Sequence, residues 1–584
     1  MAANGRLFGD GTRRSKGDKA RRYNLLAARL IAELIKSSLG PRGLEKMFVD
    51  VMGEVTVTKD GATLLRKIDV EHPAAKVIIE ASNAVDNEVG DGTTSVVVLA
   101  GALVQKAEDM LDMGIAPSTI ADGYLMGLEI ALASLGHISK EYDNTDRQAM
   151  QRLARTCLQS KALAYDDKFA GLVVDAISSI ANFAGRSIDT DDIKIEEKEG
   201  SILDAQLVRG IVIDKTIDSS SMPRSVENAR IILVDDELEG KRTRTDAEIR
   251  ITSPDQIKSY SDTQMFMIKS KVQHIIDSGA NVVFSRKGIN TLAQHMLTRA
   301  GIISVRRVKE IDLLWLAKAT GATISEKLDH EHDDHGHHHH DHDHHHHHDD
   351  HYHHEDIDIK LGSAERVYEK QVGDDRMIFV EGCRDPKAVT LLLRANSKKT
   401  LDECHRSALD AISVLRDFIV KPSVVAGGGA AEVAIAKTVR EKAPSIPGRE
   451  QIVVQKFAEA LEEIPLTIAG NAGMNVIDTL ARLRSAHSNG RASSHGVDAI
   501  ERKVKEMLPL VIEPAVVKEQ VFKTAVEVTN LLVSVDDVLM AKPTMHTHTH
   551  DDGTKHTHAG GDKEHQHDHF DRLGRQQRPK HHYY

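Results

Sequence analysis

The amino-acid sequence predicts a multidomain protein of α and α/β class, in which a mainly helical domain made from both chain ends encloses an inserted α/β domain. The 584-residue chain is longer than a single hydrophobic core supports. Apolar residues recur at helical spacing up to about residue 142 and again after about residue 401, whereas strands alternate with helices between about residues 210 and 324. Because chain ends often lie close together, an insertion of this kind is tolerable.

The N-terminal region is predicted to be mainly α-helical. A helix is expected over residues 20–38, where leucines and isoleucines recur at helical spacing and a Gly-Pro pair follows. A strand pair is expected over residues 49–57. Helical pattern then runs from residue 73 to about residue 142, and it is broken by glycine-containing segments at 90–92 and 114–117.

The middle of the chain contains predicted strands over residues 231–234, 281–285 and 304–308, separated by helices. One helix has a clear start, because Ser253 suits an N-cap, a proline follows it, and a glutamine lies three residues after the serine. Apolar residues then recur every three to five positions. We therefore expect a long capped helix over residues 254–277.

The composition excludes several classes of protein. A formal charge of -12, with 28% charged residues and no basic stripe, is not typical of a nucleic-acid-binding protein. Three cysteines, Cys157, Cys383 and Cys404, have no C-x-x-C spacing, so neither a disulfide framework nor a thiolate zinc site is indicated. The sequence has no signal-peptide pattern and no apolar stretch long enough for a membrane span. We expect a cytoplasmic protein without nucleic-acid or membrane partners.

Two aspartate-glycine loops near the start of the chain have the composition of a nucleotide site. One lies within residues 58–63 and the other within residues 90–94, where it opens onto a long apolar segment. Glycines let a backbone approach phosphates closely, and the N–H groups of a helix N-terminus attract an anion. Aspartates beside phosphates suit Mg²⁺, which prefers oxygen ligands. Together the loops predict an ATPase, although each alone is also typical of a plain turn.

Several further short motifs follow in order along the chain. The runs are Leu39-Gly40-Pro41-Arg42-Gly43-Leu44, Lys59-Asp60-Gly61-Ala62-Thr63, His72-Pro73-Ala74-Ala75-Lys76, Glu88-Val89-Gly90-Asp91-Gly92-Thr93-Thr94, Val425-Ala426-Gly427-Gly428-Gly429-Ala430 and Asn471-Ala472-Gly473. On these motifs the whole chain outside its histidine-rich stretches resembles a group II chaperonin, the TCP-1 family of archaeal thermosomes and their eukaryotic cytosolic relatives.

The resemblance implies three domains and an assembly. The expected domains are a mainly α-helical equatorial domain (1–145 and 404–541, with the intermediate boundary near 410), a small intermediate domain (146–209 and 370–403), and an α/β apical domain (210–369) with a helical protrusion at about 246–277. The family forms homo- or hetero-oligomeric double rings of eight or nine subunits per ring, which enclose unfolded protein substrates. By this resemblance the protein is an ATP-dependent chaperone with a built-in lid, and its cofactors are ATP and Mg²⁺.

The resemblance also assigns roles to individual residues. Asp60 and Asp410 match the catalytic carboxylates, and Asp410 would activate the attacking water. Asp91 matches the Mg²⁺ ligand. The expected ATP-binding residues are Gly40, Pro41, Gly61, Asp91, Gly92, Thr93, Thr94, Lys161, Gly428 and Glu513. Among these, Lys161 would sense the γ-phosphate and Glu513 would accept hydrogen bonds from the ribose hydroxyls.

Two histidine-rich stretches, residues 330–354 and the tail 542–584, are predicted to be disordered because they hold almost no aliphatic residues. Dense imidazoles bind transition metals such as Zn²⁺ or Ni²⁺ where two or three converge. The candidate ligands are His337, His338, His339, His340, His344, His345, His346, His347 and His348. Three interpretations stay open: a tolerated solvated loop, a proton-sensitive charge switch, or transition-metal buffering or delivery on a chaperonin scaffold.

Overall fold

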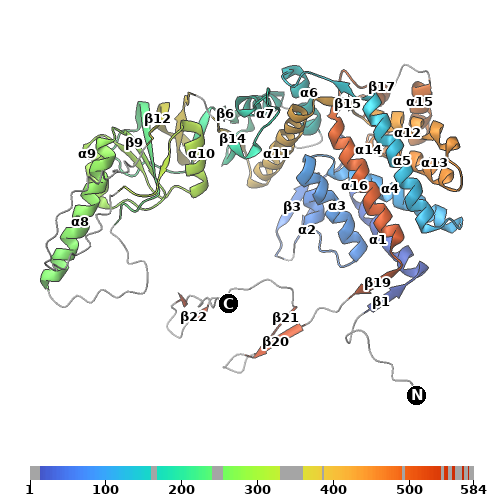
Figure 1. Ribbon diagram of the computed structural model, residues 1–584, viewed down its shortest axis with the longest axis horizontal. Helices are drawn as coiled ribbons and strands as arrows, with labels where there is room; N and C mark the ends of the chain where they lie inside the picture. The colour runs from blue at the N-terminus through green and yellow to red at the C-terminus, as the bar shows by residue number, and fades with distance from the viewer. Residues whose placement is uncertain are drawn as a thin grey trace, which may run out of the picture.

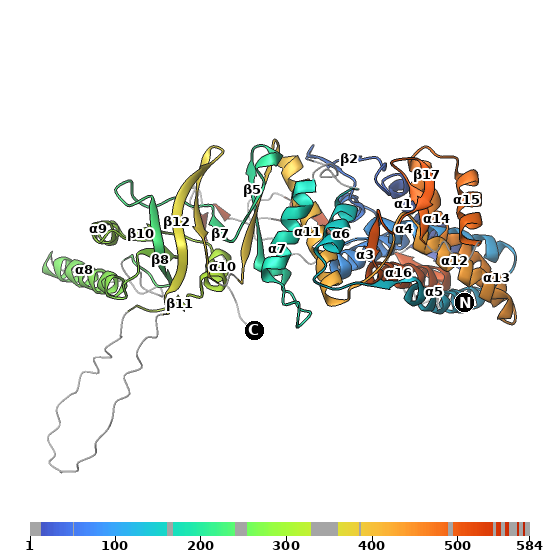
Figure 2. The same ribbon diagram turned by 90° about the horizontal axis from the view of Figure 1, so that it is seen from above.

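The computed structural model contains three bodies arranged along one long axis (Figures 1 and 2). It describes residues 13–50, 52–159, 167–239, 254–328, 360–384, 387–488 and 494–540, together with four short strands of the C-terminal tail. A helical bundle lies at one end, a sheet-containing body lies at the other, and a smaller body joins them. Each body has its own hydrophobic core, so the chain is a multidomain α and α/β protein.

The helical bundle is made from both ends of the chain. Its helices are α1 (Asp18–Lys36), α2 (Gly61–Lys67), α3 (Pro73–Val89), α4 (Thr93–Asp112), α5 (Pro117–Ile138), α12 (Ala430–Lys442), α13 (Glu450–Leu461), α14 (Glu463–Asn471), α15 (Val476–Ser488) and α16 (Ala515–Ser534). The central helix α4 packs against α1, α3, α13 and α16. Strand β1 (Arg13–Lys16) pairs antiparallel with β19 (Asp537–Met540), so segments near the two ends of the described chain lie side by side.

Short strands position the loops of this bundle. They are β2 (Lys46–Val49), β3 (Val55–Thr58), β4 (Lys140–Glu141), β15 (Ser423–Ala426), β16 (His495–Asp498), β17 (Lys503–Glu506) and β18 (Ile512–Pro514). Strands β2 and β3 form an antiparallel hairpin, and β15 lies between β18 and β4. The hairpin turns at Gly53, whose φ of 82° is a conformation that glycine adopts without strain.

The smaller body joins the helical bundle to the sheet-containing body. Its three-stranded sheet has the order β5 (Ile193–Glu199), β14 (Val389–Ala395), β6 (Gln206–Val208), and its helices are α6 (Arg147–Gln159), α7 (Asp167–Ile180) and α11 (Lys398–Val420). Helix α11 packs against both α6 and α7 and also contacts α3 and β3 of the bundle. This long helix therefore connects the small body to the loops of the bundle.

The third body is built on a seven-stranded mixed sheet. Its elements are β7 (Gly210–Ile213), β8 (Ser225–Val234), β9 (Val282–Ser285), β10 (Ile303–Val305), β11 (Ile324–Ser325), β12 (Gly362–Val372), β13 (Asp375–Glu381), α8 (Pro254–Asp277), α9 (Thr291–Arg299) and α10 (Glu310–Thr320). The strand order is β10-β9-β8-β12-β13-β7, with β11 also pairing with β8. The expected domain boundary between residues 369 and 370 falls inside β12, because the β12–β13 hairpin continues the sheet to Glu381.

The predicted helix 254–277 is confirmed, the C-terminal tail differs from its prediction, and the segment 330–354 is not described. Helix α8 has the predicted bounds, while its expected N-cap, Ser253, and the residues 330–354 lie outside the described residues. In the tail, where disorder is expected, β20 (Met545–Thr549) pairs with β21 (Lys555–Ala559), and β22 (His569–Phe570) pairs with β23 (Gln576–Gln577). The alternation of β-branched threonine with histidine in β20 suits a strand. Among the described helices, none is long and apolar enough to span a membrane.

Candidate nucleotide site

The first aspartate loop joins strand β3 to helix α2. Asp60 is the N-cap of α2, and its Oδ2 accepts a hydrogen bond of 2.8 Å from the Thr63 N–H. The Asp60 N–H donates to Thr58 Oγ1 at 3.0 Å. The second oxygen of the carboxylate, Oδ1, lies 3.4 Å from Thr93 Oγ1, which donates to it from the other aspartate loop. Asp60 is therefore held at both its backbone and its side chain.

The second aspartate loop joins α3 to α4 through two left-handed glycines. Gly90 ends α3 with a φ of 67°, and Gly92 precedes α4 with a φ of 87°. Between them, Asp91 Oδ1 accepts a hydrogen bond of 2.7 Å from the Gly92 N–H. Since a glycine stands at the N-cap, no side chain there caps the first N–H groups of α4, and they suit an anionic ligand.

The two loops lie against each other. A Cβ atom on Gly61 would stand 2.8 Å from Thr94 Oγ1, which is closer than real Cβ contacts. The hydrogen bond from Thr93 to Asp60 adds a polar contact between the same loops. The structure thus brings together the predicted residues Asp60, Gly61, Asp91, Gly92, Thr93 and Thr94.

The glycine cluster between β15 and α12 forms another part of the site. Gly428 and Gly429 have φ values of 65° and 76°, and Gly429 is the N-cap of α12. A Cβ on Gly427 would stand 2.7 Å from Glu513 Oε1, and one on Gly428 would stand 2.7 Å from the Val497 carbonyl oxygen. These close approaches leave no room for a side chain, so the backbone itself forms the surface.

Helices α14 and α16 connect the loops to one another. Ile468 of α14 lies 3.4 Å from where a Cβ added to Gly40 would stand. Pro465 of the same helix lies 2.4 Å from where a Cβ added to Gly429 would stand. Val521 of α16 lies 2.8 Å from the position of a Cβ on Gly92. The loop that contains Gly40 and Pro41 is also anchored by a side chain of α14, since Asn471 Nδ2 donates to the Leu39 carbonyl at 2.9 Å.

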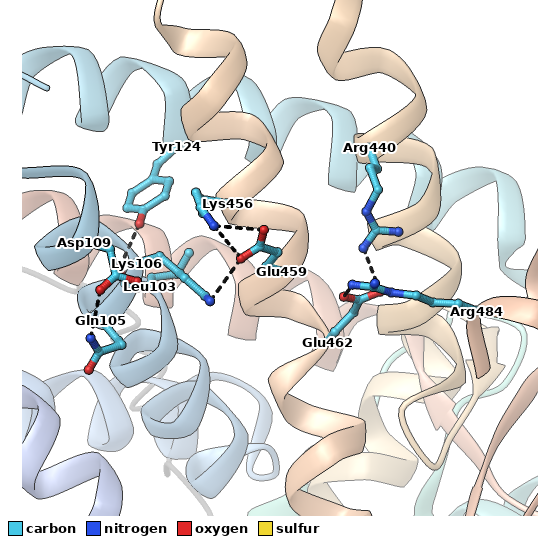
Figure 3. Close-up of polar contacts among 10 residues, drawn as sticks. All are labelled: Leu103, Gln105, Lys106, Asp109, Tyr124, Arg440, Lys456, Glu459, Glu462 and Arg484. Carbon is cyan, nitrogen blue, oxygen red and sulfur yellow. Dashed lines mark hydrogen bonds and ion pairs between the residues drawn. The ribbon is translucent and has the colours of Figure 1, made fainter. Parts of the chain in front are cut away.

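Ion pairs join the segment α12–α15 to α4 and also connect helices within that segment (Figure 3). Glu459 binds Lys106 of α4 at 3.0 Å and Lys456 at 2.9 Å. The buried Glu462, which precedes α14, binds Arg440 of α12 at 2.7 Å and Arg484 of α15 at 2.5 Å. These contacts join α13 to α4 and, through Glu462, join α12 to α15.

Helix α11 places the third predicted carboxylate beside the two loops. Its Glu403 accepts a hydrogen bond from Thr58 Oγ1 at 3.1 Å, and its Ser413 fills the space where a Cβ on Gly90 would stand. Asp410 lies between these contacts, two turns after Glu403 and one turn before Ser413, and is half-buried. Helical spacing therefore puts Asp410 on the face of α11 that meets the aspartate loops.

A buried group of three charges beside the glycine cluster was not anticipated from the sequence. Lys518 Nζ lies 2.7 Å from Glu432 Oε1 and also forms an ion pair with Glu513 Oε2. Burial lowers the pKa of Lys518, but the two carboxylates outweigh this effect and keep the pKa above its ordinary value. Burial raises the pKa of Glu513, and Lys518 opposes the rise. The available signal was a lysine within the apolar stripe of α16, between Ala515 and Phe522.

Two sets of predicted residues lie outside the described residues. Lys161 is one of them, and the nine candidate metal-binding histidines between residues 337 and 348 are the others. In the part of the chain that the structure describes, no group of three or more histidine, cysteine, aspartate or glutamate side chains is arranged to hold a metal ion.

Fold and site together define a chaperonin: residues 31–543 match the TCP-1/cpn60 chaperonin family, and the chain belongs to that family. It is 44% identical over 541 residues to thermosome subunit alpha of Archaeoglobus fulgidus, covering 92% of this chain and 94% of the relative. It is also 44% identical over 550 residues to a thermosome subunit of Methanopyrus kandleri, covering 93% and 96%. A thermosome subunit of Pyrococcus abyssi is 42% identical over 542 residues.

Proposed function

We propose that this chain is a subunit of an ATP-driven double-ring chaperone that encloses unfolded proteins and hydrolyses ATP with Mg²⁺. The observation that carries the proposal is the convergence of the Asp60 loop, the Asp91 loop and the Asp410 face of α11. Positioned carboxylates and backbone N–H groups are what phosphoryl transfer requires, because its catalysis depends on alignment and charge neutralisation. Lys161 stays a predicted γ-phosphate sensor.

The residues of the site fit Mg-ATP. Backbone surfaces at Gly61, Gly92 and Gly428 leave room for no side chain, and the uncapped start of α4 offers N–H groups to phosphate oxygens. Asp91 would hold Mg²⁺, which when bound neutralises phosphate charge. Asp60 is fixed by hydrogen bonds beside Thr93, and Asp410 would orient the attacking water through a carboxylate oxygen. Gly40 and Pro41 would line the same pocket.

We assign the three bodies to the equatorial, intermediate and apical domains. The helical bundle would be the equatorial ATPase domain, and the body with β5, β14 and α11 would be the intermediate domain. The seven-stranded body would be the apical domain, and α8 would be part of its protrusion. Since β13 ends at Glu381 and β14 begins at Val389, we place the second apical boundary between these strands. Movement of α11 with the intermediate domain would couple hydrolysis to closure.

Exposed apolar residues on the bundle support assembly with further copies of the chain. Helix α1 presents Tyr23, Leu26, Leu30 and Leu34 at spacings of three and four residues, and their exposed fractions range from 38% to 59%. Met47 of the β2–β3 hairpin is 70% exposed. A stripe of this kind is typical of a protein interface. We propose homo- or hetero-oligomeric rings of eight or nine subunits.

Exposed apolar residues on the seven-stranded body support the capture of unfolded chains. Ile311 and Leu314 of α10 are 48% and 46% exposed, and Phe266 of α8 is 73% exposed. Burial of apolar segments against such residues would drive capture. Helix α8 would then contribute to the lid that closes over the substrate.

Exchange of Asp410 for alanine tests the hydrolysis mechanism. We expect Asp410→Ala to bind Mg-ATP and to assemble, while its turnover falls by roughly 100-fold or more, because the water-orienting carboxylate is gone. Steady-state phosphate release and nucleotide binding measure the two effects separately. The exposed Leu409→Ala, one residue away on α11, serves as the control. Near-normal turnover of Asp410→Ala would show that the carboxylate is misassigned.

Metal buffering or delivery by the histidine-rich segments stays a separate prediction, and the described residues add no support to it. Removal of residues 330–354 tests it. If the segment is a metal store, the deletion abolishes most Zn²⁺ or Ni²⁺ uptake in equilibrium dialysis and leaves ATP hydrolysis intact. Equal uptake with and without the segment would reject the alternative.

A further inference from the structure

An open cavity lies where the chain passes between the small body and the sheet-containing body. Its volume is about 1320 Å³, whereas cavities of about 300–1,000 Å³ already accommodate small-molecule ligands. Helix α7 lines it from the small body, and strands β8 and β12 line it from the sheet-containing body. The loops of the candidate nucleotide site all belong to the helical bundle, so the proposed function gives this cavity no role.

Both passages of the chain between these bodies bring an arginine to the cavity. Arg209 separates β6 of the small body from β7 of the sheet-containing body, and Arg384 follows β13 on the return to β14. Arg230, within β8, adds a third guanidinium group from the sheet itself. Side chains from both junction segments and from the sheet therefore line the same space.

Two of the acids that line the cavity already have cationic partners. Asp175 of α7 binds Arg147 of α6 at 2.5 Å, and Glu227 of β8 binds Arg366 of β12 at 3.1 Å. The charges within each pair cancel, so neither acid is left to compensate the three arginines at the junction.

The three arginines carry charge that the protein itself does not compensate. The guanidinium groups of Arg209, Arg230 and Arg384 form no hydrogen bond or ion pair with the residues that the structure describes. One further acid, Glu365, lines the cavity, so three positive charges and one negative charge leave a formal excess of +2. A cleft lined mainly by one sign of charge focuses the electric field and concentrates ions of the opposite sign.

The chemistry of guanidinium groups indicates which anion fits. Each group offers N–H donors in a planar fork that binds a phosphate or a carboxylate through paired hydrogen bonds. A terminal phosphate has more acceptor oxygens and more charge than a carboxylate, so it satisfies several arginines with fewer groups. The size of the cavity leaves room for a chain of phosphates rather than a single ion.

We propose that this cavity binds a small anion with two or more phosphate groups and that the bound anion restricts movement between the two bodies. Arg209 and Arg384 would hold it from the two passages of the chain, and Arg230 would hold it from the sheet. The anion favours the arrangement in which all three arginines share one cavity, since a ligand stabilises the state that it binds more tightly. This second site is independent of the proposed ATP function.

Isothermal titration calorimetry with sodium tripolyphosphate tests the site on the full-length protein. Excess Mg²⁺ and a saturating concentration of ADP keep the proposed nucleotide site occupied. Arg209→Met, Arg230→Met and Arg384→Met should each weaken binding of tripolyphosphate by about 10- to 100-fold, as expected for lost hydrogen bonds between charged groups. Arg376→Met is the matched control, because this arginine of β13 is 57% exposed and lies outside the cavity.

Hydrogen–deuterium exchange tests where the anion binds and what it does to the junction. Tripolyphosphate should slow amide exchange in the segment 206–213, which contains Arg209 and joins the two bodies. Exchange in the β2–β3 hairpin of the bundle should not change, and Arg384→Met should lose the slowing. Citrate, which carries carboxylates in place of phosphates, should bind more weakly than tripolyphosphate.

Three results would overturn the proposal. No binding of tripolyphosphate by the wild type, or equal binding by the wild type and the three cavity variants, would reject the site. Citrate binding as tight as that of tripolyphosphate would reject the phosphate class, and unchanged exchange in the segment 206–213 would reject the restriction of movement. The arginine variants identify the site by themselves, so failure of the proposed ATP function would leave this test intact.

Discussion

Two buried lysines, Lys518 in the helical bundle and Lys194 in the small middle body, are each held by two carboxylates but serve different parts of the molecule. All partners of Lys518 belong to the bundle, and one of them, Glu513, reaches the surface beside the glycine cluster. Lys194 of β5 instead binds Asp312 of α10 in the neighbouring body at 2.6 Å.

The contacts of Lys194 cross from one body to the next. Its Nζ also donates to the Val212 carbonyl of β7 at 2.7 Å and lies 3.1 Å from Glu196 of its own strand. The ammonium stands 5.3 Å from the ring centroid of Trp315, and the Trp315 Nε1–H donates to the Asp191 carbonyl at 2.7 Å.

One arrangement of charges therefore has two uses in this molecule. Inside a single core, a lysine with two acids fixes a carboxylate, Glu513, that is partly exposed. Between two bodies, the same arrangement lies at a junction that also has a small shared hydrophobic cluster, in which Val208 and Leu392 meet Phe379. The first should therefore matter most for stability of the bundle and for binding, and the second for the relative position of the two bodies.

The largest expected effect is that of Lys518→Met on stability. Loss of the ammonium leaves the buried Glu432 and the partly exposed Glu513 without their cation, which should cost about 3–5 kcal/mol of unfolding free energy. Denaturant unfolding followed by circular dichroism measures the loss. Lys523→Met removes an exposed ion pair and should cost less than about 1 kcal/mol. Equal losses of unfolding free energy in the two variants would show that the buried ion pairs stabilise the protein no more than an exposed one.

Asp417 is a buried acid that pairs with a single cation, Arg416, among the described residues. Burial raises its pKa to about 6, although Arg416 opposes the rise at 2.8 Å. Because the folded protein holds this proton more tightly than the unfolded chain, the acid lowers stability as pH rises from about 4 to about 6. Above that range the full cost remains.

The stability of Asp417→Asn relative to that of the wild type should therefore rise over the same range of pH. We expect the difference in unfolding free energy to shift by about 2–3 kcal/mol in favour of the variant between pH 4 and pH 6. Unfolding curves at half-unit steps of pH measure it. Asp143→Asn is the control, since Thr145 lowers the pKa of that exposed carboxylate, so this variant should not gain stability relative to the wild type as pH rises. A difference that does not vary with pH would contradict the assignment.

Lys194→Met should have a smaller effect on stability, about 1–3 kcal/mol, because its acids Asp312 and Glu196 keep some contact with water, whereas Glu432 is completely buried. Its main effect should be local, at Trp315, the single tryptophan of the chain. We expect tryptophan emission to move to longer wavelength as the indole ring becomes solvated.

Lys198→Met is the matched control for the junction. It lies on the same strand and also reaches the sheet body, but its partners Asp214 and Asp375 are 49% and 61% exposed. Its removal should leave the emission unchanged. An identical spectrum for Lys194→Met and the wild type would show that Lys194 does not hold the junction.

Local features of this molecule were predictable from the sequence, because helical spacing and glycine-proline signals report on neighbouring residues. The bounds of α8 and the breaks that flank α4 are examples. The hydrogen bond between Thr58 and Glu403 was not predictable, since 345 residues separate the pair and only the packing of α11 brings them together. Pairing of Lys518 with Glu432 depends in the same way on the tertiary arrangement that brings α16 and α12 close to each other.

Electron microscopy of the purified protein, without nucleotide and with ATP and aluminium fluoride, tests whether the chain forms double rings that close on nucleotide. We expect stacked double rings in both samples, with open ends in the absence of nucleotide and closed ends in its presence. Isolated subunits, or rings whose ends do not respond to nucleotide, would contradict this expectation.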